Sequence, residues 1–443
     1  MIKKMTLSMM SLIFLVSCDT MNEDPKLEAE LMITIENIAA TKSYTASGVF
    51  NTPVGASAPA PAFPGEAYEA TFSAAPGAKL SFATMFVQSN DFFYAPDGMG
   101  VELFDSMGDQ ITGDITNQVM LWDVGSEMNQ EPGLGADQAP RQAGANTGSH
   151  DSNMMVRMAS DDFGNLPAVT DVVMVTLTSM GATAFKLRIE NVSTGNTLMT
   201  TDGGSVAVPL APGVFVIHHD DNVLFTDGMS DYGYGLAAIA EDGDPSSLSN
   251  MLASDVGVTH LFAPGVYVLH EDADPLFSAG MADRGDGLEH LAEDGDPSGL
   301  VASLASSSLY GMNGAFNTPT GAAGPAPLAT GQTYSFVITA TEGEYLSLAT
   351  MLVHSNDLFV APEGMGIRLF NDGSVITGDI TDNFYLWDAG TEINETPGIG
   401  LNQAPRQAAA NSGLDEMGSV HMVNDMYANP EVSDVLRITI TEI

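Results

Sequence analysis

Leu-Ser-Phe-Ala-Thr-Met at Leu80–Met85 recurs as Leu-Ser-Leu-Ala-Thr-Met at Leu346–Met351, and each copy opens a longer repeated stretch. Both stretches continue through Ser-Asn-Asp, Ile-Thr-Gly-Asp-Ile-Thr and Leu-Trp-Asp-x-Gly-x-Glu, and both end in Gln-Ala-Pro-Arg-Gln. The first runs over Leu80–Gln142 and the second over Leu346–Gln407. Matched residues lie 265 or 266 positions apart. That spacing far exceeds a solenoid period, so the sequence predicts duplication of a whole domain.

Matching strands are predicted on both sides of each repeated stretch. Leu31–Ile38 and Phe185–Val192 alternate apolar with other residues, the period-two pattern of a half-buried strand, and we interpret them as first strands. Val172–Thr178 and Leu436–Ile443 are the corresponding last strands. We expect each first strand to pair with the last strand of its own domain, with one domain over residues 30–181 and the other over 184–443.

The second predicted domain carries an insertion, over about residues 203–308, which is itself duplicated. Pro-Gly-Val-Phe-Val-Ile-His at Pro212–His218 matches Pro264–His270, and Ala-Glu-Asp-Gly-Asp-Pro follows in both units. Each unit is predicted to form a strand and two short helices separated by Asp-Gly-Asp-Pro. The predicted helices are Leu236–Ala240, Ser246–Ala253, Leu288–Ala292 and Ser298–Ala305. The remaining chain is punctuated by 45 Gly and 23 Pro, typical of short strands in an all-β fold. We therefore expect two tandem antiparallel β-sandwiches.

The N-terminus predicts export and a lipid anchor. Met1–Ser17 has two lysines followed by an apolar run that is too short to span a bilayer, as in a signal peptide. The run ends in Leu-Val-Ser-Cys, which resembles a bacterial lipobox, so Cys18 is the predicted lipidation site. Residues 18–29 would then form a tether. We expect a lipoprotein on the outer membrane or cell surface of a bacterium, with the anchor as its contact with the membrane.

The charge of the chain excludes one class of partner. Lys and Arg total 13 against 57 Asp and Glu, a formal net charge of −44. Such a surface repels nucleic acid, so no nucleic-acid partner is expected. An excess of carboxylates suits calcium, although acidic surfaces are also common in exported proteins. The chain has a single cysteine, so it forms no internal disulfide.

Three carboxylates in each repeat are candidate metal ligands. Asp123 and Glu127 lie four residues apart across Gly125, and a third carboxylate, Asp91, comes from the Ser-Asn-Asp turn. Glycine permits a tight loop that turns both side chains toward one point, and calcium prefers several oxygen ligands. The same positions in the second repeat are Asp357, Asp388 and Glu392. The spacing is not that of an EF-hand, and the alternative is that these acids only cap turns.

These motifs resemble the bacterial branch of the spondin N-terminal domain family. The resemblance rests on Ser-Asn-Asp-x-Phe, on Trp-Asp-x-Gly-x-Glu and on the Pro-Gly-Val and Ala-Glu-Asp-Gly-Asp-Pro units, and it covers about residues 30–181 and 184–443. It implies a β-sandwich related in shape to C2 domains, a calcium site at one end with ligands at the three carboxylate positions, and a role in attachment to extracellular material. This chain lacks the disulfides and the thrombospondin-type modules of the animal members.

We expect a non-enzymatic, calcium-binding surface lipoprotein that acts in adhesion or binds an extracellular protein or glycan. The sequence has no nucleophile elbow, no phosphate-binding glycine loop and no catalytic cysteine motif. The alternative is a secreted polysaccharide hydrolase in which the paired Asp and Glu serve as acid and base.

Overall fold

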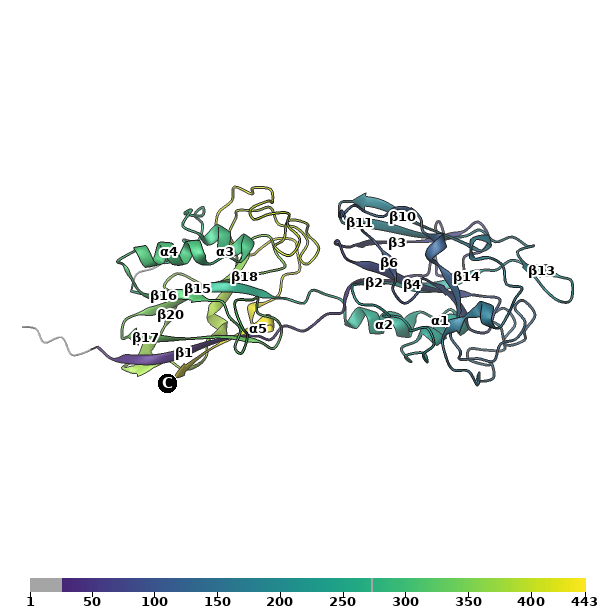
Figure 1. The fold of residues 1–443 in the computed structure, drawn as a ribbon, viewed down its shortest axis with the longest axis horizontal. Helices are drawn as coiled ribbons and strands as arrows, with labels where there is room; N and C mark the ends of the chain where they lie inside the picture. The colour runs from purple at the N-terminus through teal and green to yellow at the C-terminus, as the bar shows by residue number, and fades with distance from the viewer. Residues whose placement is uncertain (1–25, 272–273) are drawn as a thin grey trace, which may run out of the picture.

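The computed structural model describes residues 26–271 and 274–443 and forms two lobes side by side along its long axis (Figure 1). In each lobe a four-stranded sheet faces a larger sheet, and every strand pair in the described part of the chain is antiparallel. The expected all-β sandwich fold is confirmed. The predicted signal peptide over residues 1–17 and Cys18 lie outside the described residues.

Lobe 1 is built from one unbroken stretch of chain, residues 44–255. Its smaller sheet has the strand order β3-β11-β10-β7, and its larger sheet has the order β2-β14-β4-β5-β8-β9 with β6 beside β4. The smaller sheet consists of β3 (Ala67–Ser73), β7 (Gly113–Asp114), β10 (Val173–Gly181) and β11 (Ala184–Asn191). The larger one consists of β2 (Tyr44–Phe50), β4 (Lys79–Phe86), β5 (Phe92–Ala95), β6 (Val101–Glu102), β8 (Met120–Asp123), β9 (Arg157–Met158) and β14 (Leu210–His218). A separate small hairpin joins β12 (Leu198–Met199) to β13 (Ser205–Val206).

Lobe 2 repeats this plan with the orders β17-β1-β26-β23 and β16-β15-β18-β19-β24-β25, with β20 beside β18. The smaller sheet consists of β1 (Glu28–Asn37), β17 (Thr333–Thr341), β23 (Gly378–Asp379) and β26 (Leu436–Glu442). The larger one consists of β15 (Phe262–His270), β16 (Tyr310–Phe316), β18 (Tyr345–Leu352), β19 (Leu358–Pro362), β20 (Ile367–Arg368), β24 (Phe384–Asp388) and β25 (His421–Met422). A short hairpin of β21 (Phe370–Asn371) and β22 (Ser374–Val375) and the helical turn α5 (Val432–Val435) complete the lobe.

The predicted domain boundaries are wrong at β1 and β11. β1, the expected first strand of the first domain, lies in lobe 2 between β17 and β26, so Figure 1 shows a purple strand among green and yellow ones. β11, the expected first strand of the second domain, forms a hairpin with β10 and pairs with β3 in lobe 1. The expected boundary between residues 181 and 184 therefore falls inside a hairpin turn. Alternating apolar residues define a strand's buried face but not its partner, which is why the sequence pattern misassigned both strands.

A buried asparagine at the end of each strand fixes this assignment. The Nδ2 of Asn191 in β11 donates to the carbonyls of Ala62 and Val208 in lobe 1, at 2.8 and 2.9 Å. The Nδ2 of Asn37 in β1 donates to the carbonyls of Leu328 and His260 in lobe 2, at 2.8 and 2.9 Å. Both asparagines are fully buried, so these hydrogen bonds replace water for the amide and tie each strand to its own lobe.

The two repeated units of the predicted insertion also divide between the lobes. β14 pairs with β2 and β4 in lobe 1, and β15 pairs with β16 and β18 in lobe 2. Each strand is central in its sheet, so the units are part of the sandwich and not an addition to the second domain. The helices that follow are α1 (Leu236–Asp242), α2 (Ser246–Ser254), α3 (Leu288–Asp294) and α4 (Ser298–Ser306), as the sequence predicted.

Each larger sheet is covered on both faces. In lobe 1 one face packs on the smaller sheet through residues such as Phe82 and Phe215, and the other packs under α1 and α2 through Val214, Val216 and Ile239. This double burial explains why β14 and β15 are continuously apolar. Lobe 2 has two equivalent cores of its own.

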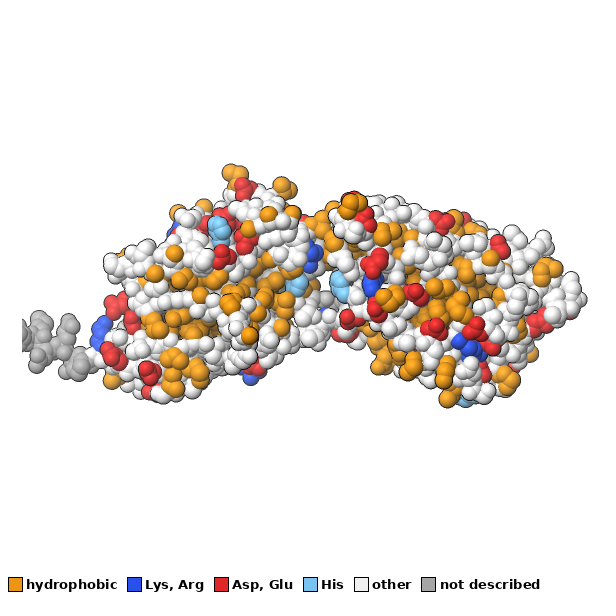
Figure 2. Space-filling view, viewed as in Figure 1, with side chains coloured by type: hydrophobic (Ala, Val, Ile, Leu, Met, Phe, Trp, Pro, Cys, Tyr) orange, Lys and Arg blue, Asp and Glu red, His pale blue; other side chains and the backbone are white. Residues whose placement is uncertain are grey.

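The two segments that connect the lobes, at residues 42–44 and 257–259, lie side by side. The amide of Gly257 donates to the carbonyl of Tyr44 at 2.9 Å, and the amide of Lys42 donates to Oγ1 of Thr259 at 2.8 Å. Lobe 1 is thus inserted into lobe 2 between β1 and β15. Acidic side chains are scattered over both lobes on the face seen in Figure 2. Within residues 26–271 and 274–443, no helix has the length and apolarity that a bilayer span requires.

Candidate metal centre

The predicted carboxylates gather where two neighbouring strands of the larger sheet meet. Asp91 directly precedes β5, Asp123 ends β8, and these two strands pair with each other. After β8 the chain turns at Gly125, whose φ is +73°, and the Gly125 amide donates to Oδ1 of Asp123 at 2.6 Å. A Cβ at Gly125 would lie 2.7 Å from the carbonyl oxygen of Asn153, so the loop requires glycine for its conformation and for this close approach.

The first aspartate of each set uses only one of its two carboxylate oxygens to hold the loop. In lobe 2, Oδ2 of Asp357 accepts the amides of Thr391 and Glu392 at 2.8 and 3.2 Å. Oδ1 of Asp357 is buried and has no hydrogen-bond partner among the described residues, and the same is true of Oδ1 of Asp91 in lobe 1. The turn-capping alternative therefore accounts for only one of the two oxygens of each carboxylate. The other oxygen is buried without a partner, which is costly for a charged carboxylate unless a proton or a cation is bound to it.

In lobe 2 this aspartate belongs to a cluster of three acids. One ligand oxygen each from Asp357, Asp388 and Glu416 lies within 4.8 Å of the other two. Asp357 and Asp388 are buried, whereas Glu416 is exposed, so the cluster opens to solvent on the Glu416 side. The Asn394 amide and the Gly390 amide hold the two oxygens of Asp388 at 2.6 and 2.7 Å. An all-oxygen, anionic set that is held in this way fits a hard cation such as calcium.

The structure does not bring Glu392 into this cluster. Oε1 of Glu392 accepts the Gly413 amide at 2.7 Å and Oε2 accepts the Asn356 side chain at 3.3 Å, so the carboxylate fastens two loops together. Glu127 does the same in lobe 1, where it accepts the Gly148 amide at 2.8 Å. Both glutamates are only 2% exposed. Of the six predicted ligands, the cluster thus contains Asp357 and Asp388.

Glu416 was missed because it lies in a stretch with little resemblance between the two copies. The strand-like bridge from Glu392 to Asp415 places Glu416 beside the site, as the bridge from Glu127 to His150 places Asp151 in lobe 1. The only sequence signal is the acid at equivalent positions in the two copies.

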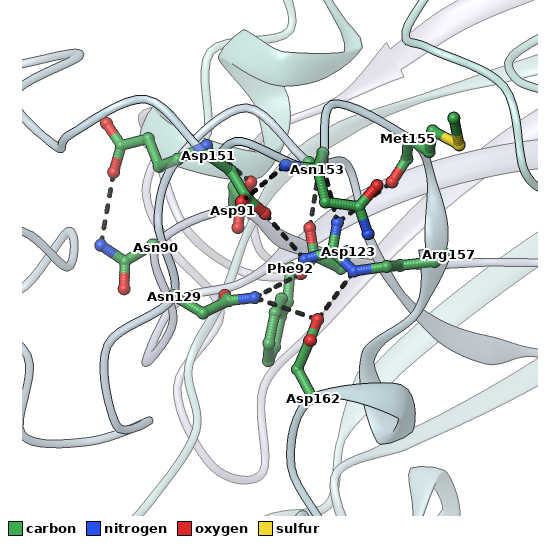
Figure 3. Close-up of polar contacts among 12 residues, drawn as sticks. Asn90, Asp91, Phe92, Asp123, Asn129, Asp151, Asn153, Met155, Arg157 and Asp162 are labelled. Atoms are coloured by element: carbon green, nitrogen blue, oxygen red, sulfur yellow. Dashed lines mark hydrogen bonds and ion pairs between the residues drawn. The ribbon is translucent and has the colours of Figure 1, made fainter.

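Lobe 1 has acids at the corresponding positions, but an arginine lies among them. Nη2 of Arg157 lies 2.8 Å from Oδ2 of Asp123 and 2.8 Å from Oδ2 of Asp151, as Figure 3 shows. Nε of Arg157 lies 2.7 Å from Oδ2 of Asp162. Asp91 and Asp123 are fully buried, and Glu127 stands apart from the ion pairs. Of the three acids that the sequence predicted as calcium ligands in this lobe, the guanidinium therefore pairs with Asp123, together with Asp151 and Asp162.

Burial raises the pKa values of these acids. Burial, and then the charge of Asp388, raise the pKa of Asp357 to about 7. Burial and Asp388 also raise the pKa of Glu416, against the neighbouring His421. In lobe 1, burial and Asp91 raise the pKa of Asp123, whereas the hydrogen bond from Asn129 and the charge of Arg157 lower it. Keeping these buried carboxylates charged is therefore costly, and a nearby cation lowers that cost.

A further buried glutamate from the helical unit lies beside each site. Glu293 in α3 is 1% exposed, and burial raises its pKa to about 8, with the charges of Glu392 and Asp357 adding to the rise. Glu241 in α1 is 6% exposed, and burial raises its pKa to about 7. These residues are the glutamates of the Ala-Glu-Asp-Gly-Asp-Pro motif, which the sequence indicated only as helix ends.

No protein-family model matches the chain, and no curated protein matches it.

Proposed function

We propose that the protein is a non-enzymatic, lipid-anchored surface protein of the spondin type that binds calcium in lobe 2 and acts in adhesion or in binding an extracellular protein or glycan. The observation that carries the proposal is the cluster of Asp357, Asp388 and Glu416, with the buried Oδ1 of Asp357 left unpaired among the described residues. Calcium would join the β19–β24 end of the sheet to the loop that carries Glu416. It would offset the mutual repulsion of the three acids.

The expected effect of calcium is a rise in stability. An ion that binds only the folded lobe stabilises it by RT ln(1 + [L]/Kd), about 2.7 kcal/mol at a hundredfold excess over Kd. Extracellular modules bind calcium with Kd on the order of 10⁻⁴–10⁻³ M, so millimolar calcium should raise the melting temperature of lobe 2 measurably. Magnesium should raise it less, because magnesium keeps its waters and demands octahedral geometry.

The calcium test compares thermal unfolding in calcium, magnesium and chelator for wild type and for Asp388→Asn. We expect the calcium shift to disappear in Asp388→Asn. The matched control is Asp123→Asn in lobe 1, which should keep the shift. A wild type with equal melting temperatures in calcium and chelator would refute the calcium part of the proposal.

The anchor is tested separately from the ion. Wild type should fractionate with membranes and incorporate radioactive palmitate, and Cys18→Ala should do neither. Membrane association that survives in Cys18→Ala would refute the lipid anchor.

The burial of Glu127 and Glu392, each 2% exposed, argues against the hydrolase alternative, because neither carboxylate is free to reach a substrate. The alternative predicts release of reducing ends from polysaccharide, lost in Glu392→Gln. The binding proposal predicts no turnover with any polysaccharide, and a glycan array together with pull-down of extracellular proteins would identify the ligand.

A further inference from the structure

Arg157 and His421 occupy the same position in the two lobes. Arg157 begins β9 and lies opposite Asp123, and His421 begins β25 and lies opposite Asp388. The neighbouring residues are also matched, since Met158 lies opposite Trp122 and Met422 lies opposite Trp387. One lobe thus presents a permanently charged guanidinium where the other presents a shorter imidazole.

The contacts of Arg157 resemble the surroundings of a bound cation. Its guanidinium makes ion pairs with Asp123, Asp151 and Asp162 at 2.7–2.8 Å. Nη1 donates to the carbonyls of Asn153 and Met155 at 3.0 and 3.1 Å. The side chain is 11% exposed, and carboxylates and backbone carbonyls surround it (Figure 3). These are the ligand types that calcium takes in proteins.

Lobe 2 keeps the acids and lacks the arginine. Asp388 corresponds to Asp123, and Glu416 corresponds to Asp151, since each follows the residue that bridges to the loop glutamate. Among the described residues, neither acid forms an ion pair with Lys or Arg. Nδ1 of His421 instead lies 2.8 Å from the Ser419 carbonyl.

The acid that pairs with Nε of Arg157 has no counterpart in lobe 2. Five residues after Arg157 stands Asp162, which pairs with Nε of Arg157, whereas five residues after His421 stands the exposed Met426. The acid that pairs with Nε of the guanidinium is therefore absent from the lobe that has no guanidinium. The acids that remain in lobe 2 are those that converge on one point.

We infer that Arg157 is a tethered cation, which fills in lobe 1 the place that lobe 2 keeps for a metal ion, so that the chain binds one calcium ion and not two. The inference rests on the proposed calcium site for lobe 2. It attributes the difference between the lobes to the residue at one equivalent position, Arg157 in lobe 1 and His421 in lobe 2. Lobe 1 is stabilised at any calcium concentration. Lobe 2 is stabilised only where calcium is present, as it is outside a cell.

The test exchanges the two residue pairs and counts bound calcium by calorimetric titration of the two-lobe chain. His421→Arg with Met426→Asp should abolish calcium binding. Arg157→His with Asp162→Met should raise the stoichiometry from one to two. The chain with both exchanges should again bind one ion, and Asp123→Asn, not Asp388→Asn, should then abolish it.

A second readout needs no metal. In chelator, His421→Arg with Met426→Asp should raise the melting temperature of lobe 2, because the guanidinium neutralises Asp388 and Glu416. This variant adds an ion pair and removes none, so it keeps the test informative if the reciprocal variant fails to fold.

The outcomes separate the two claims. Wild type without calcium binding refutes the proposed function, and the inference that rests on it falls as well. Wild type that binds one calcium ion with an affinity that His421→Arg leaves unchanged refutes the inference and keeps the proposed function. A folded Arg157→His variant that still binds only one ion also overturns it.

Discussion

Ile33, in the first strand of the described residues, lies directly opposite Ile440, in the last strand. Everything needed for lobe 1 lies between the two segments that connect the lobes, so a fragment of residues 42–257 should fold alone. We expect cooperative thermal unfolding with a β-type circular dichroism spectrum. A fragment of residues 30–181 is the control. It lacks β11 and β14 and should remain unfolded, and a stably folded 30–181 fragment would contradict this topology.

Ile33→Ala should destabilise lobe 2 and leave lobe 1 unchanged. Ile33 is fully buried in a core with Ile440, and such truncations cost about 2–5 kcal/mol. For a lobe of this size that lowers the melting temperature by about 2–4 °C per kcal/mol. Leu187→Ala in β11 is the matched variant and should affect lobe 1. If scanning calorimetry showed that Ile33→Ala destabilises lobe 1 and Leu187→Ala destabilises lobe 2, the assignment of β1 to lobe 2 and of β11 to lobe 1 would be refuted.

Arg157→Ala should destabilise lobe 1 strongly when calcium is absent. Removing one partner of a buried ion pair leaves an uncompensated charge and costs about 3–5 kcal/mol. Asp123 is fully buried, so solvent does not replace the lost guanidinium. Calcium should recover part of the loss in this variant and should leave lobe 1 of the wild type unchanged. Equal melting temperatures of the variant in calcium and chelator would show that the vacated position does not accept a cation.

The stability of lobe 2 in chelator should fall as the pH rises from about 4.5 to about 8. The pKa of Glu293 is raised to about 8 from its ordinary value of 4.5, so in this window the folded state holds a proton that the unfolded state has lost. Stability therefore decreases with rising pH. Glu293→Gln should remove this contribution, so the variant gains melting temperature over wild type at pH 8.5 and little at pH 4.5. A difference that is independent of pH would contradict the raised pKa.

Glu241→Gln is the corresponding variant in lobe 1. Burial raises the pKa of Glu241 to about 7. The gain in melting temperature that Glu241→Gln gives with rising pH should therefore reach its full size at a lower pH than the gain that Glu293→Gln gives in lobe 2. Comparing Glu241→Gln with wild type across this pH range separates the titration of Glu241 from that of the acids around Arg157, because the variant lacks only the former.

The local elements were predictable from residue pattern because their cause is local. Alternation in Leu31–Ile38 and Phe185–Val192 defines a buried face, and Asp-Gly-Asp-Pro ends one helix before another begins. Partner choice was not predictable in this way. β1 and β11 have the same pattern and would fit either lobe, and the selection depends on connections that only the folded chain shows.

The candidate site was predictable as far as its motif extends. Gly125 turns the loop as expected, and Asp357 and Asp388 converge because β19 and β24 are neighbours. Glu127 and Glu392 were assigned by spacing alone, and loop amides hold them instead. Glu416 lies in the loop before β25 and Arg157 begins β9, and long-range packing decides where both lie, so no short motif marks them.

Counting the calcium ions bound to the unlipidated chain is the most direct measurement. Isothermal titration should give one ion per wild-type chain, none in Glu416→Gln, and one in Asp151→Asn, the matched change in lobe 1. No binding in wild type, two ions per wild-type chain, or unchanged binding in Glu416→Gln would contradict a single metal centre formed by Asp357, Asp388 and Glu416.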